Sequence, residues 1–225
     1  MIHCFGDSWA AGAELKMGQK PFVHWVASQL SRSYMNHGKN GNSLGMIVYS
    51  ISQSLAKIKP SDMVIVVIPP DTRWYDENVN GFYSVSAYQR DDYLKFLNHK
   101  TLNWFKYHHS LFIYIIQKML TDYGCYYIMM HNYGKLIDPK EYNLNIDFDR
   151  FLSKNDLVTL LSDSEYTWRN YPDHKEPEHR FDDTDGPPGD IFTGKYFAGC
   201  KNHPNEYGHQ EIARLIIEKY NSDQK

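Results

Sequence analysis

The sequence predicts an α/β protein with three layers, in which helices cover both faces of a mostly parallel central sheet. Short apolar segments typical of strands alternate along the chain with segments whose apolar residues recur at helical spacing. The segment MVIVVI (63–68) is continuously apolar, as expected of a strand that is buried on both faces, and CYYIMM (125–130) is expected to be the next buried strand. Alternation of this kind favours parallel strands joined by helical crossovers.

The first part of the chain is expected to contain two strands and two helices. The strand 1–5 ends at a glycine, and Pro21 suits the first turn of a helix that runs to about residue 30. Residues 33–43 fit a short strand followed by a loop rich in glycine and asparagine. The clearest helix covers residues 44–58, where apolar side chains follow the i, i+3, i+4, i+7 rule up to Pro60.

The remainder alternates regular elements with two irregular segments. The buried strand ends at Pro69-Pro70, because proline cannot donate to a sheet ladder. Asn80-Gly81 suits a hairpin turn. A long helix is expected over 101–123, and a last helix is expected from Glu206, with Asn205 as its N-cap.

The composition limits the number of domains and the kinds of partner that we expect. The 225 residues carry a net charge of −3 and fit one domain, 1–225, with irregular elaborations at about 71–100 and 132–195. The chain has no long run of lysine and arginine, which argues against nucleic acid or an anionic membrane as a partner. No apolar run approaches the ~20 residues that cross a bilayer, and the first strand leaves no room for a signal peptide, so a cytoplasmic location is expected.

Cysteine and histidine usage predicts neither a metal nor another cofactor. Cys4, Cys125 and Cys200 are odd in number and far apart, which fits neither a disulfide framework nor a zinc knuckle. Among the 11 histidines, neither the adjacent pair at 108–109 nor the pair at 203 and 209 has a usual ligand spacing.

The stretch FGDSWAAG (5–12) places a serine directly after the first strand. Ligands of a doubly wound sheet bind beyond the carboxyl ends of the strands, so Ser8 stands where a nucleophile is expected. Glycine, aspartate and serine also favour ordinary turns, and the tripeptide alone leaves both interpretations open.

The far end of the chain carries a histidine that favours the nucleophile. The stretch NHPNEYGHQEIA (202–213) places His203 at the start of the last helix. A serine hydroxyl is a poor nucleophile unless a neutral imidazole lies within hydrogen-bond reach. A loop histidine at this point can lie over the same sheet edge as Ser8.

Together, FGDS near one end and HPNxxGH near the other resemble the SGNH, or GDSL, hydrolase family. Its members are α/β esterases, lipases and carbohydrate deacetylases of about this length. The resemblance covers nearly the whole chain and implies a flavodoxin-like sheet. It implies that Ser8 is the nucleophile and His203 the base, and that the backbone N–H groups of Ser8 and Gly41 hold the oxyanion. His209 matches a motif position that is not normally catalytic, and we expect it to be a structural residue of the last helix.

Two positions depart from the family pattern. The third motif normally supplies an asparagine that donates to the oxyanion, and here that position is Asp71 in IPPDTRW. Because an ionised aspartate accepts hydrogen bonds, the donor is either missing or replaced by Thr72 or Arg73. Arg73 fits an oxyanion or substrate contact, and equally a surface ion pair. Some divergent members encoded by bacteriophages resemble this turn.

The second departure is Cys200, which stands where the family has an aspartate three residues before the histidine. A neutral thiol cannot stabilise an imidazolium as a carboxylate does. The orienting role then passes to a backbone carbonyl or to another acid such as Asp190 or Asp185, and a Ser-His dyad remains chemically sensible.

The function expected from these residues is hydrolysis of a carboxylic ester, with an acylated carbohydrate as a candidate substrate. The carbohydrate is suggested by aromatic residues between positions 74 and 88, which can stack on sugars or form a small core of their own. The alternative is an SGNH-like binding or structural module without turnover, such as a bacteriophage virion component, which would be virion-associated.

Overall fold

The structure is a computed structural model that describes residues 1–70, 73–76, 83–86, 102–132, 142–161 and 203–225. Its centre is a four-stranded sheet in the order β2-β1-β3-β6, in which all neighbouring strands are parallel. The strands are β1 (Ile2–Phe5), β2 (Tyr34–Asn36), β3 (Met63–Ile68) and β6 (Tyr126–His131). This is the strand order of a flavodoxin-like sheet, as the family resemblance implies.

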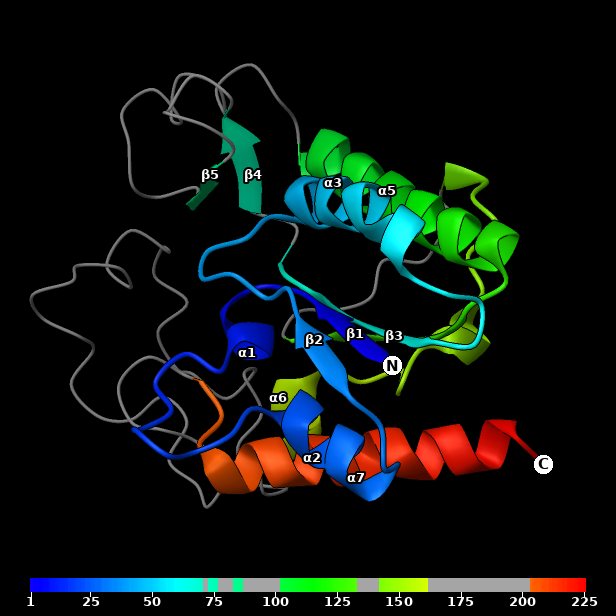
Figure 1. The fold of residues 1–225 in the computed structure, drawn as a ribbon. Coiled ribbons are helices and arrows are strands. Elements are labelled where there is room, and N and C mark those ends of the chain that lie inside the picture. Colours follow the sequence, from blue (N-terminus) through cyan, green and yellow to red (C-terminus); the bar gives the residue numbers. More distant parts are fainter. Residues whose placement is uncertain (71–72, 77–82, 87–101, 133–141, 162–202) are drawn as a thin grey trace, which may run out of the picture.

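Helices cover both faces of this sheet (Figure 1). The helices α3 (Leu44–Ser54) and α5 (Leu102–Tyr123) lie on one face. The other face carries α2 (Phe22–Gln29), α6 (Leu157–Leu161) and α7 (Glu206–Asp223). The three-layer α/β architecture expected from the sequence is therefore confirmed.

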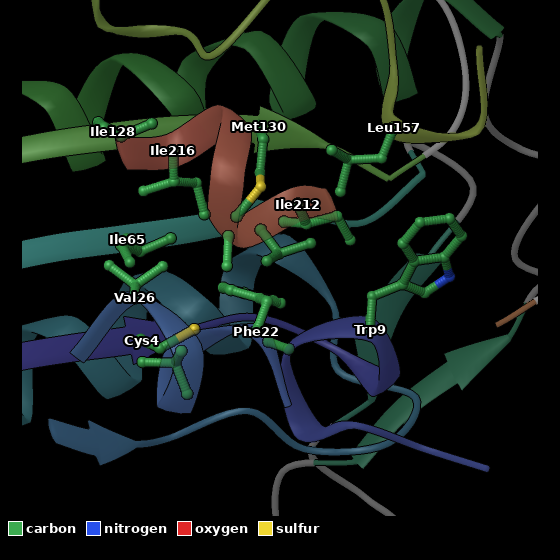
Figure 2. Close-up of a cluster of buried hydrophobic side chains, with 14 of the residues drawn as sticks. Cys4, Trp9, Phe22, Val26, Ile65, Ile128, Met130, Leu157, Ile212 and Ile216 are labelled. Carbon is green, nitrogen blue, oxygen red and sulfur yellow. The ribbon is translucent and has the colours of Figure 1, made fainter. Parts of the chain in front are cut away.

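Alternate residues of the inner strands supply the two halves of the core. On β3, Met63, Ile65 and Val67 pack toward α2 and α7, while Val64, Val66 and Ile68 pack toward α3 and α5. Every residue of β3 is buried, which explains why this segment has no polar position. Figure 2 shows the half beneath α2 and α7, with Trp9 at the edge of the cluster.

Several shorter elements complete the described part. They are α1 (Ser8–Ala11), the 3-10 turns η1 (Leu55–Lys57) and η3 (Phe148–Arg150), and an antiparallel pair made of β4 (Arg73–Asp76) and β5 (Tyr83–Ser86). The pairing of Asp76 with Tyr83 agrees with a hairpin around Asn80-Gly81, although that turn itself lies outside the described residues.

The carboxyl end of β1 leads directly into α1, and close packing explains the glycine at this junction. A Cβ on Gly6 would lie 2.7 Å from the Cβ atoms of both Ala10 and Val67. The loop after β2 passes equally close, since a Cβ on Gly38 would lie 2.5 Å from the backbone nitrogen of Ala11. The absence of a Cβ at Gly6 and Gly38 thus allows α1 to pack closely against the edge of the sheet.

Candidate active site

Buried hydrogen bonds fix the turn that presents Ser8. The carboxylate of Asp7 is fully buried and caps α1 by accepting from the Trp9 backbone N–H at 3.0 Å. The side-chain amide of Asn132, just beyond β6, donates to the same carboxylate at 2.7 Å. Asp7 therefore ties the turn after β1 to the end of the outermost strand on that side. The side chain of Trp9, only 1% exposed, packs into the hydrophobic core and holds the turn in place.

His203 meets Ser8 from the opposite end of the chain. The Nε2 atom of His203 lies 2.8 Å from Oγ of Ser8, a hydrogen bond between residues 195 positions apart. Ser8 is 5% exposed. The side chain of Asn205, two residues after His203, caps α7 by accepting from the Gly208 N–H at 3.0 Å and so fixes the start of the helix. The structure thus brings together the serine and histidine that the sequence pairs.

A carboxylate lies on the other side of the same imidazole. Oε2 of Glu14 is 3.4 Å from Nδ1 of His203, and the two side chains are 21% and 15% exposed. Glu14 has a left-handed backbone with φ of 68°, shortly after Gly12, which ends α1 with φ of 77°. Two left-handed residues so close together turn the chain back toward the serine.

The loop that carries Gly41 is attached to the serine turn. The backbone N–H of Lys39 and the side-chain amide of Asn42 both donate to the carbonyl of Gly6, at 3.1 Å in each case. Gly41 itself has φ of 71°, a conformation that favours glycine. The expected oxyanion glycine therefore lies in a loop hydrogen-bonded to the segment that bears Ser8.

His209 has a structural environment, as the sequence suggests. It is fully buried on α7, and its Nδ1 accepts a hydrogen bond from the backbone N–H of Phe22 at 3.2 Å. Burial, with a smaller contribution from the nearby charge of His203, lowers the pKa of His209 to about 3. A neutral His209 therefore joins α7 to the start of α2.

The remaining predicted site residues are only partly described. Arg73 is the first residue of β4, while Asp71, Thr72, Asp190 and Cys200 lie outside the described residues.

Of the other cysteines, Cys4 and Cys125 are buried free thiols. Within the described ranges, no group of three or more histidine, cysteine, aspartate or glutamate side chains is placed to hold a metal ion. In the same part of the chain, no helix combines the length and apolar character needed to cross a membrane.

Comparisons with known proteins by sequence and by structure give different results. The sequence matches no family model and no curated protein. The structure is similar to a lipolytic protein of the G-D-S-L family from Desulfitobacterium hafniense, with a TM-score of 0.51 at 11% identity, covering 97% of this chain and 98% of the other. It is also similar to the lipase Lip_vut3 from a goat rumen metagenome, with a TM-score of 0.52 at 9% identity and coverage of 97% and 96%. The chain has the SGNH hydrolase fold.

A third structure with this SGNH fold, that of TesA, has a TM-score of 0.51 at 10% identity and coverage of 97% and 96%. The similarity extends over nearly the whole chain in each case, as the resemblance of the two terminal motifs implies.

Within the SGNH fold of this chain, sequence reasoning missed Glu14. A signal was available, because Glu14 is the only acidic residue between Asp7 and Asp62. Nothing in the spacing of the motifs, however, points to an acid that lies so close to Ser8 in the sequence.

Proposed function

We propose that this protein is a serine hydrolase that cleaves carboxylic esters, with Ser8 as the nucleophile and His203 as general base and then general acid. The observation that carries the proposal is the 2.8 Å contact between Ser8 Oγ and His203 Nε2 at the carboxyl edge of an SGNH-type sheet. This distance lies within the reach required for direct proton transfer.

The reaction follows from this contact. Nε2 of His203 removes the proton from Oγ of Ser8 as the oxygen attacks the ester carbonyl carbon. The imidazolium then gives this proton to the departing alkoxide, which leaves an acyl-serine. A water molecule attacks the acyl-serine while Nε2 takes a proton from it, and that proton returns to Oγ when the carboxylic acid leaves.

Backbone groups are proposed to hold the oxyanion of both tetrahedral intermediates. The donors are the N–H groups of Ser8 and Gly41, which lie on two segments that are hydrogen-bonded to each other through Gly6. One such donor contributes about 3–4 kcal/mol of transition-state stabilisation. Arg73 and its neighbours Asp71 and Thr72 are the proposed contacts for the substrate, or for a third oxyanion donor.

Within the class of esters, an acylated carbohydrate is the proposed substrate. The support is the aromatic character of residues 74–88, which follow β3 in the sequence, since β3 ends at the same edge of the sheet as β1 and Ser8. Aromatic rings stack on the apolar faces of sugars. A panel that compares acetylated oligosaccharides with simple short-chain esters of matched leaving group tests this choice.

Two measurements test the hydrolase proposal. A fluorophosphonate probe is expected to label the wild type and not Ser8→Ala. Hydrolysis of a short p-nitrophenyl ester is expected to be lost in Ser8→Ala and in His203→Ala, and the double variant is expected to be no worse than either single variant, because the two residues act as one unit.

Matched controls are available on the described surface. Ser52 is exposed on α3 and His24 is half-buried on α2, so Ser52→Ala and His24→Ala are expected to keep wild-type turnover. Hydrolysis that survives Ser8→Ala would refute the proposal. Absence of both labelling and turnover in the wild type would favour the binding or structural module instead.

A further inference from the structure

We propose that Glu14 is the positioning residue for His203: its carboxylate orients the imidazole and supports the positive charge that develops on it. The inference rests on the proposed function, because it concerns the same serine and histidine. It supplies an acid for a chain in which the position three residues before the histidine is a cysteine.

The contact has the arrangement that this role requires. Ser8 Oγ lies 2.8 Å from Nε2 of His203, and Glu14 Oε2 lies 3.4 Å from Nδ1, so the hydroxyl and the carboxylate face the two different nitrogens of one ring. For Nε2 to accept the serine proton, the ring proton must be on Nδ1, next to the carboxylate. A distance of 3.4 Å is long for a charge-assisted hydrogen bond, but such contacts tighten in substrate complexes.

The path of the chain explains how Glu14 reaches this position. The backbone N–H of Ala13 donates to the carbonyl of Ser8 at 2.9 Å, and the N–H of Leu15 donates to the carbonyl of Gly12 at 3.2 Å. These bonds fold the residues after α1 back over the start of the helix. Glu14 is therefore attached to the same short segment as the nucleophile, and His203 fits between the two.

The contact between Glu14 and His203 is partly shielded from solvent. Both side chains are about four-fifths buried or more, which strengthens the attraction between carboxylate and imidazolium relative to water. His209 also interacts electrostatically with His203, and it stays neutral because burial lowers its pKa to about 3. The carboxylate of Glu14 is thus well placed to balance the charge that His203 gains.

The test replaces the carboxylate without changing its size. Glu14→Gln is expected to lower kcat for a short p-nitrophenyl ester by about 10²–10⁴-fold with little change in KM, because loss of the orienting acid of a triad acts on the transition state. Glu14→Asp keeps the charge one methylene further away and is expected to recover part of this loss.

The pH profile distinguishes a positioning role from a structural one. Without the neighbouring negative charge, the imidazolium of His203 is less stable, so the acidic limb of the kcat/KM profile is expected to move to lower pH by about one unit in Glu14→Gln. In a His203→Ala background, Glu14→Gln is expected to have no further effect on the residual rate. The control is Glu206→Gln, which removes an acid from the first turn of α7 and is expected to leave both kcat and the profile unchanged.

The outcomes separate this inference from the proposal on which it rests. If Ser8→Ala is inactive while Glu14→Gln keeps wild-type kcat and an unshifted profile, the hydrolase proposal stands and the role of Glu14 is refuted. If Ser8→Ala retains turnover, the hydrolase proposal itself is wrong. Should Glu14→Gln fail to fold, the wild type decides: a strongly deshielded Nδ1 proton of His203 in the NMR spectrum supports the contact, and its absence refutes it.

Discussion

At the scale of single residues, the position of Ser8, the proposed nucleophile, depends on the buried carboxylate of the residue before it. Asp7 accepts from the Trp9 N–H and from the Asn132 side chain, and none of its surface is exposed. A buried charge is tolerated when hydrogen bonds replace its hydration. The aspartate next to the serine therefore acts as a fixed acceptor that holds the turn, while the serine remains available for chemistry.

Removal of one donor to this carboxylate is expected to weaken the turn. Asn132→Ala should lower the free energy of unfolding by about 1.5–3 kcal/mol, the usual worth of a hydrogen bond to a charged group. Urea unfolding followed by circular dichroism measures the change. The control is Asn145→Ala at an exposed position, which should stay within about 0.5 kcal/mol of the wild type. Equal stability of the two variants would show that the Asn132 bond contributes little.

At the scale of elements, the candidate base depends on how α7 is held. The helix packs Ile212, Ala213 and Ile216 into the core shared with α2, and His209 accepts from the first residue of α2. Its N-terminus is defined by the Asn205 cap, two residues beyond His203. The position of the imidazole is thus set by a buried helix face and by a cap, rather than by the loop alone.

Loss of the cap is expected to affect stability and turnover together. Asn205→Ala should lower the free energy of unfolding by about 1 kcal/mol. It should also lower kcat/KM, because His203 and Pro204 are then no longer held in a fixed position before the helix. Asn205→Asp keeps an acceptor for the Gly208 N–H and should behave like the wild type in thermal unfolding and in ester hydrolysis. A loss of activity in Asn205→Asp equal to that in Asn205→Ala would contradict the capping explanation.

At the scale of the whole molecule, local patterns predicted most of the elements. The continuous apolar run of β3 and the helical spacing of apolar residues in α3 reflect which residues are buried, so a short stretch of sequence is enough to predict each element. The pairing of Ser8 with His203 could be expected only because both lie in terminal motifs that resemble one family. The contact of Glu14 with His203 and that of Asp7 with Asn132 could not, since each joins residues more than a hundred positions apart without a local pattern.

The buried neutral histidines predict how the stability of the whole fold depends on pH. Burial holds the pKa of His209 at about 3 in the folded state, whereas an unfolded chain protonates histidine near pH 6.5. Between these values the unfolded state binds one more proton at this site, so the free energy of unfolding falls as the pH falls. The contribution is fully present above about pH 6.5. Burial also lowers the pKa of His37, to about 4, and of His131, so both act in the same direction.

His209→Gln isolates one of these contributions. Glutamine does not titrate, and its side-chain oxygen can accept from the Phe22 N–H, so the variant should lose part of the acid sensitivity without losing the bond. We expect its free energy of unfolding to fall less steeply than that of the wild type between pH 6.5 and 4, by up to about 1.4 kcal/mol per pH unit. Urea unfolding of both proteins at several pH values in this range measures the two slopes. Parallel curves would show that His209 is protonated in the folded protein, which would contradict its burial as a neutral link between α7 and α2.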